Sequence, residues 1–171
     1  MHQMNAGEMR SHLRELGSRL KAKGIQGEIL LAGGAVMVLV VKSRDSSVDI
    51  DAVFVHAGVE IRAIAAEMAR DLGLAPSWIN DHVKVFIGKK APTVVLYRLP
   101  GLTVSMVSLE YMFYLKAWAD DPKDFSDLRA LARRLGLRNE AEAYRIVAKF
   151  SDGALPGNAQ LRLEALFERP R

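Results

Sequence analysis

The spacing of apolar residues divides the chain into a first part that contains strands and a second part that is helical. In residues 7–23, leucine and methionine recur every three or four positions, which predicts an amphipathic helix that ends at Gly24. Residues 25–32 and 48–55 are rich in Val, Ile, Leu and Phe and predict strands. The segment 48–55 is apolar on both faces apart from two aspartates, which predicts a central strand.

The middle of the chain predicts further elements of both kinds. A helix, a turn or short helix, and two strands are expected over residues 60–72, 76–81, 93–99 and 102–107. Pro100–Gly101 is a two-residue turn signal, so the two strands should form an antiparallel hairpin. The apolar segment 35–41 fits a short buried helix and a strand equally well.

After residue 107, every periodic segment is helical. These helices are expected over residues 108–119, 122–135, 139–150 and 157–168. The capping residues agree, since Asp121 precedes a first-turn proline and Asn139 stands three residues before Glu142. We therefore expect an α+β fold, with a short mixed β-sheet and flanking helices in residues 1–107 and a helical C-terminal part, residues 108–171, packed on that core.

Composition narrows the class of protein. The chain has 171 residues, of which 50% are hydrophobic and 26% charged, as is usual for a globular domain. It has no cysteine, which excludes a disulfide scaffold, a zinc ribbon and a thiol nucleophile. The longest apolar run, residues 29–41, is shorter than the roughly 20 residues of a membrane helix, and the N-terminus has no hydrophobic signal core. We expect a cytoplasmic protein with no membrane partner.

Charge is distributed unevenly along the chain. The net charge of +4 combines +3 in residues 1–24, −3 in residues 25–127 and +4 in residues 128–171. An acidic centre with basic flanks suits a metal site that binds phosphates, and it equally suits ordinary solubility.

Asp49 and Asp51 stand in an unusual place. They are two residues apart on a predicted strand, so both side chains point to one face, which Val53 and Val55 continue. If that face is covered, the two carboxylates need a compensating cation, and Mg²⁺ with oxygen ligands meets this need. If the strand instead runs out to solvent at a sheet edge, the pair needs no such explanation.

Two further charged residues face inward on predicted helices. Lys116 falls within the apolar face of the helix 108–119, and Asp124 within that of the next helix, with Asp127 at its margin. The lysine either extends its ammonium to solvent or meets a phosphate or the acidic pair. An acid in the first turn, such as Asp124, is also favoured by the helix dipole alone.

Over about residues 29–131, the sequence resembles the DNA-polymerase-beta-like nucleotidyltransferase superfamily, and within it the small prokaryotic AbiEii-like and MenT-like members. The resemblance rests on Leu31-Ala32-Gly33-Gly34-Ala35, Arg44 and Ser47 before Asp49-Ile50-Asp51-Ala52-Val53, Trp78-Ile79-Asn80-Asp81, Ser108-Leu109-Glu110 with Lys116, and Lys123-Asp124-Phe125-Ser126-Asp127-Leu128.

The resemblance implies a minimal nucleotidyltransferase fold and a site with divided roles. The implied nucleotide-binding residues are Gly33, Gly34, Arg44, Ser47 and Lys116, with the two glycines starting the helix that holds the triphosphate. The implied metal ligands are Asp49 and Asp51, for Mg²⁺ (or Mn²⁺). The implied catalytic residues are Asp49, Asp51, Lys116, Asp124 and Asp127, where Asp124 or Asp127 completes the acidic cluster or orients the acceptor.

The implied reaction transfers a nucleoside monophosphate from a nucleoside triphosphate to a hydroxyl on RNA, protein or a small molecule. Expected partners are thus the triphosphate, an acceptor such as tRNA or a protein, and the antitoxin of a toxin–antitoxin or phage-defence pair. The sequence departs from the family pattern in having Gly-Gly for Gly-Ser and no acid in residues 93–99 and 102–107. A degenerate nucleotide-binding or partner-binding scaffold is therefore an alternative, as is an RNA-binding adaptor that uses Arg129, Arg133, Arg134 and Arg138.

Overall fold

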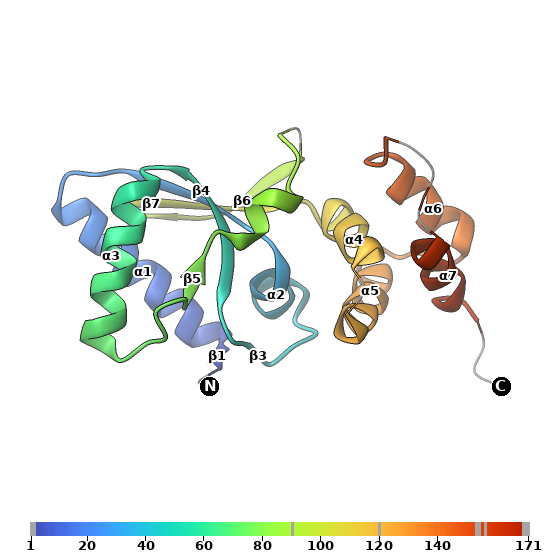
Figure 1. The fold of residues 1–171 in the computed structure, drawn as a ribbon, viewed down its shortest axis with the longest axis horizontal. Coiled ribbons are helices and arrows are strands. Elements are labelled where there is room, and N and C mark those ends of the chain that lie inside the picture. The colour runs from blue at the N-terminus through green and yellow to red at the C-terminus, as the bar shows by residue number, and fades with distance from the viewer. Residues whose placement is uncertain (1–2, 90, 120, 153–154, 156, 169–171) are drawn as a thin grey trace. The chain divides into compact units, whose positions relative to one another are not determined.

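The chain forms an α+β fold, as expected (Figure 1). The computed structural model describes residues 3–89, 91–119, 121–152, 155 and 157–168. It divides into two compact units, residues 1–107 and residues 108–171, at the position where the sequence turns from strands to helices. The strands of the described chain all lie in the first unit.

A five-stranded mixed sheet organises the first unit. Its strands are, in order across the sheet, β5 (Ile79–Asn80), β4 (Ile50–His56), β2 (Gly27–Leu31), β7 (Leu102–Val107) and β6 (Thr93–Leu99). The hairpin of β6 and β7 is antiparallel, as predicted, while β2 runs parallel to β7 and β4 runs parallel to β5. The predicted central strand over 48–55 corresponds to β4, which lies inside the sheet between β5 and β2. Because β5 pairs with it only at Ile50 and Asp51, the rest of β4 has a paired neighbour on one side, β2.

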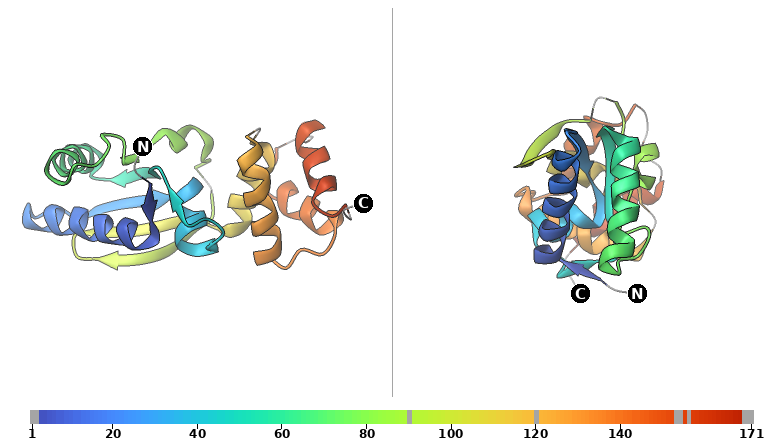
Figure 2. Two further views of the ribbon diagram at one scale, coloured as in Figure 1. Left: turned by 90° about the horizontal axis from the view of Figure 1, so that it is seen from below. Right: turned by 90° about the vertical axis from the view of Figure 1, so that its left-hand side faces the viewer.

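Two long helices cover one face of this sheet. They are α1 (Ala6–Ala22) and α3 (Gly58–Leu72), which lie side by side (Figure 2). Side chains of both helices, Leu20 and Ile61, approach β2 at Gly27. Asn5 begins α1 with a capping box that it forms with Glu8. Leu30 and Val53 lie on the other face of the sheet. Because side chains alternate between the two faces along β4, Asp51 points to the same face as Val53.

Shorter elements complete the first unit. The ambiguous segment 35–41 is helical, as α2 (Gly33–Val36) continues directly into the π-helical turn η1 (Met37–Val41). The strand pair β1 (Met4–Asn5) and β3 (Ser46–Ser47), the strand β5 and the 3₁₀ helix η2 (His82–Phe86) were not predicted. Each is too short for a hydrophobic period to develop.

The second unit is helical, as expected. It contains α4 (Leu109–Trp118), α5 (Pro122–Arg134), α6 (Glu140–Ala148) and α7 (Gly157–Ala165). Ser108, Asp121 and Asn139 cap the first three through their side chains. None of the helices in the described part of the chain has the length and hydrophobicity that a membrane crossing requires.

Candidate functional site

The two aspartates lie at the start of β4. Asp51 is the second residue of the strand, and Asp49 directly precedes its first residue. Both are half-buried. The expectation that their face is covered along the strand was wrong at its far end, because Val55 is 53% exposed. Long helices cover only the opposite face of the sheet within the first unit, so the acidic pair stands in a partly open site.

The carboxylate of Asp51 packs against the chain reversal that follows β2. The backbone N–H of Ala32 donates a hydrogen bond to the carbonyl of Asp51, 3.1 Å away. Gly33 then has a φ of +60°, and a Cβ atom there would lie 2.6 Å from Oδ2 of Asp51. Because this space and this φ both exclude a side chain, only glycine lets α2 begin directly beside the carboxylate.

Gly34 makes the same kind of close approach to Ser47. A Cβ atom at residue 34 would lie 2.6 Å from the Ser47 hydroxyl and 3.9 Å from a guanidinium nitrogen of Arg44. Ser47 belongs to β3, which β1 holds in place by antiparallel pairing. The hydroxyl that a Gly-Ser pair would carry at residue 34 is absent, and the Ser47 hydroxyl lies next to Gly34.

Asn80 is a site residue whose role the sequence did not predict. Its side-chain amide donates a hydrogen bond of 3.0 Å to Oδ2 of Asp49, and its Oδ1 accepts one from the backbone N–H of His82. Asn80 is only 8% exposed and lies on β5, directly beside Asp51. In the sequence, its position directly after two large apolar residues, Trp78 and Ile79, was the one hint that it is buried and needs a hydrogen-bond partner.

The structure thus brings together one group of the predicted residues in the first unit. Gly33 contacts Asp51, Gly34 contacts Ser47 near Arg44, and Asn80 joins Asp49 to the neighbouring strand.

The other predicted residues form a separate cluster in the second unit. The ammonium of Lys116, on α4, forms ion pairs with Asp124 and Asp127 of α5, at 2.9 Å in the case of Asp127 Oδ2. Lys116 is 12% exposed, so it does not extend to solvent. The placement of Asp127 at the helix margin was wrong, since it is the most buried of the three at 1%. It is turned inward because α4 packs against that side of α5.

Arg162 of α7 lies close to the turn between α4 and α5. One guanidinium nitrogen donates to the backbone carbonyl of Ala119, and the guanidinium also lies 6.0 Å from the ring centre of Phe125. Its Nε and Nη2 atoms are buried and have no hydrogen-bond partner among the described residues. No periodic signal in the sequence marked this residue.

Comparisons with known proteins add no family to these observations. No family model, curated protein or solved structure matches this chain.

The donor set of Asp49 and Asp51 suits a hard divalent cation. Both supply carboxylate oxygens, and Asn80 fixes one of them from outside, as residues behind metal ligands commonly do. Within the described ranges, no group of three or more His, Asp or Glu side chains is close enough to hold a metal ion. Two carboxylates are nonetheless the usual protein share of a Mg²⁺ site that substrate phosphates complete.

Proposed function

We propose that the protein is a metal-dependent nucleotidyltransferase, which moves a nucleoside monophosphate from a nucleoside triphosphate to a hydroxyl acceptor. The observation that supports this most is the contact of the Asp51 carboxylate with Gly33, next to Gly34, which Ser47 and Arg44 approach. Phosphoryl transfer needs carboxylates that bind a cation, and it needs closely packed backbone, hydroxyl and guanidinium donors that bind phosphate.

Asp49 and Asp51 would hold Mg²⁺ (or Mn²⁺), which would neutralise the phosphates and polarise the reacting phosphoryl group. The task of Asn80 would be to keep the Asp49 carboxylate in one orientation while the triphosphate binds. Such positioning matters because the reaction gains its rate from alignment and charge rather than from a covalent intermediate.

The triphosphate itself would be held by the chain beside these acids. Glycines at residues 33 and 34 allow phosphate oxygens to approach the backbone closely. The Ser47 hydroxyl and the Arg44 guanidinium lie against Gly34 and would donate to the same oxygens. Ser47 would thereby supply the hydroxyl that Gly34 lacks.

Lys116, Asp124 and Asp127 would act as a unit from the α4–α5 pair. An ammonium has three N–H donors, and the two carboxylates use two of them. The third would be available to a phosphate group, while the acids would hold the ammonium in place or orient the acceptor. The same proposal includes a cytoplasmic location, where the reaction would consume cellular nucleoside triphosphates. It also includes a toxin role and an antitoxin partner.

One observation favours a second candidate function. Asp124 and Asp127 are both engaged by Lys116, so neither is available as a third metal ligand unless that cluster opens. A degenerate site would still bind a nucleotide and would serve as a nucleotide-binding or partner-binding scaffold.

The experiment that separates the two candidates is a transfer assay. The protein is incubated with each α-labelled nucleoside triphosphate, Mg²⁺ or Mn²⁺ and a cell extract, and label is sought on RNA, on protein and in small molecules. We expect transfer that the double variant Asp49→Ala, Asp51→Ala abolishes. The matched control, Glu60→Ala with Asp71→Ala, removes two exposed acids from α3 and should retain transfer. Nucleotide binding in calorimetry without transfer or pyrophosphate release would support the scaffold instead.

A further inference from the structure

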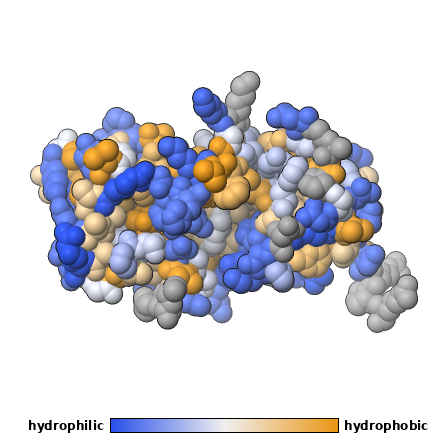
Figure 3. Space-filling view, viewed as in Figure 1, coloured by the Kyte–Doolittle hydropathy of each residue, from blue (hydrophilic) through white to orange (hydrophobic). Residues whose placement is uncertain are grey.

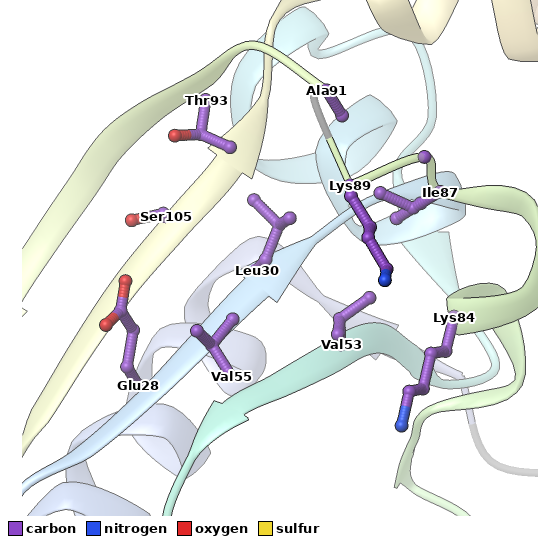
Figure 4. Close-up of a pocket in the computed structure, with 11 residues that line it drawn as sticks. Glu28, Leu30, Val53, Val55, Lys84, Ile87, Lys89, Ala91, Thr93 and Ser105 are labelled. Carbon is purple, nitrogen blue, oxygen red and sulfur yellow. The ribbon is translucent and has the colours of Figure 1, made fainter.

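A pocket lies on the open face of the sheet, next to the candidate site. It has a volume of about 490 Å³, and its floor is formed by apolar side chains of β2 and β4, including Leu30 and Val53 (Figure 4). Val53 follows Asp51 by two residues and shares its face of β4. The pocket therefore begins one side chain away from the acidic pair.

The two sides of the pocket differ in charge. Lys84 of η2 and Lys89 of the loop that follows η2 lie on one side, and Glu28 and Ser105 lie on the opposite side (Figure 4). Both lysines are exposed, and neither forms an ion pair with a carboxylate in the described part of the chain. A ligand that spans the pocket would meet cations at one end, apolar floor in the middle and hydrogen-bond acceptors at the other end.

The short helix η2 adds an exposed aromatic ring to this edge. Phe86 is 68% exposed and directly precedes Ile87, which lines the pocket. Its neighbour Val85 is more exposed still. Hydrophobic surface accordingly lies beside strongly hydrophilic surface in this region of the first unit (Figure 3). Apolar side chains that are exposed to water between two lysines contribute little to the stability of the fold, so they indicate a binding surface.

We propose that this pocket and the η2 edge bind single-stranded nucleic acid, which is the acceptor of the transfer. The role of this nucleic acid as acceptor rests on the proposed function, whereas its binding does not. Phe86 would stack on an unpaired base, the two lysines would contact backbone phosphates, and Glu28 would accept from a base amino group. Exposed rings between cations are the usual pattern of single-strand sites. An acidic peptide would use the lysines but would gain nothing from the ring and would meet Glu28 at the far side.

The test measures binding of a fluorescein-labelled single-stranded 12-mer, as RNA and as DNA, by anisotropy, with neither triphosphate nor metal present. Lys84→Glu with Lys89→Glu should weaken binding at least roughly tenfold and reduce the slope of log K against log salt by about 1.4, for two lost phosphate contacts. Phe86→Ala should weaken it at least about fivefold through lost stacking, and Val85→Ala less than about twofold. The control Arg14→Glu with Lys21→Glu makes the same charge change on exposed positions of α1, on the other face of the sheet. It should stay within about twofold of wild type.

Several outcomes would overturn the inference. The wild type could fail to bind the 12-mer, or the α1 control could lose as much affinity as the Lys84 and Lys89 variant. A polyglutamate peptide that competes with the 12-mer equally well would indicate an acidic protein partner. An equal loss of Mg²⁺-triphosphate affinity in the Lys84 and Lys89 variant would assign the pocket to the donor. The two proposals fail separately. Single-strand binding that depends on Phe86 but without transfer refutes only the proposed function, and transfer with unaltered single-strand binding in the variants refutes only the pocket.

Discussion

Lys116 and Asp127 form an ion pair of 2.9 Å in which the carboxylate is almost fully buried. Asp124 shares the same ammonium, so the cluster holds one positive and two negative charges between α4 and α5. An arrangement of this kind is sensitive to the loss of its cation, because a buried carboxylate without a partner is far less stable than a paired one.

Replacing the cation should therefore destabilise the protein. We expect Lys116→Met to lower the free energy of unfolding by about 3 kcal/mol or more, because the buried Asp127 carboxylate loses its ion pair with the ammonium. The control is Lys149→Met, which breaks the exposed pair with Glu110 in the same unit and should cost less than about 1 kcal/mol. Urea unfolding of both variants measures the difference. Equal losses in the free energy of unfolding would show that the Lys116 cluster stabilises the protein no more than the exposed Lys149–Glu110 pair does.

Gly33 should be much harder to replace than Gly73, although both have a positive φ. Gly33→Ala places a Cβ atom against Asp51 and in a left-handed conformation, while Gly73→Ala meets only the second problem, since nothing lies within 4 Å of it. We expect a loss of about 1 kcal/mol for Gly73→Ala and about 3 kcal/mol for Gly33→Ala. The measurement is urea unfolding of both variants. A Gly33 variant no less stable than its Gly73 counterpart would mean that the Asp51 carboxylate moves aside at little cost.

The contact between Gly34 and Ser47 can be tested by rescue. Gly34→Ala alone should lose about 1–3 kcal/mol, because its Cβ would lie 2.6 Å from the Ser47 hydroxyl. Ser47→Ala removes that hydroxyl, so the double variant should recover most of the loss, with a coupling energy of about 1 kcal/mol or more in a double-mutant cycle. Additive losses would place the two residues out of contact.

The sequence predicted the elements that depend on local signals. The α1 helix, the β6–β7 hairpin and the α5 cap all follow from spacing or from a turn or capping residue within a few positions. The strand β5 and the helix η2 did not, because Ile79–Asn80 and His82–Phe86 are set by contacts with β4 rather than by any period of their own.

The candidate site was predictable only where chemistry alone singled out a residue. Asp49, Asp51 and Lys116 stood out as charges on apolar faces. Asn80 did not, since an amide gains its role from the one carboxylate that it contacts. The burial of Asp127 depends on how α4 packs against α5, which a helical wheel of a single helix does not contain.

Two capped helices should make stability fall in acid. The backbone N–H of Lys123 lowers the pKa of Asp121, and the backbone N–H and guanidinium of Arg138 lower the pKa of Glu142. The folded state thus binds fewer protons, so this stabilisation is complete above about pH 4.5 and is lost as the pH falls through the lowered pKa values. Urea midpoints at pH 6 and pH 3 should differ less in Asp121→Asn with Glu142→Gln than in wild type. An unchanged difference would contradict this assignment.

The amide of Asn80 should matter more for metal binding than for folding. Asn80→Ala removes the donor that orients Asp49, and loss of such a group behind a metal ligand typically weakens metal affinity about 10- to 100-fold. Titration with Mn²⁺ in the presence of a non-hydrolysable triphosphate, followed by electron paramagnetic resonance, measures that affinity. The control is Asn158→Ala, which removes an asparagine from α7 in the second unit and should leave Mn²⁺ binding unchanged. If Asn80→Ala binds Mn²⁺ as tightly as wild type while its unfolding midpoint falls, the amide serves only to fasten β5 to β4, and the Asp49 carboxylate needs no partner to hold its cation.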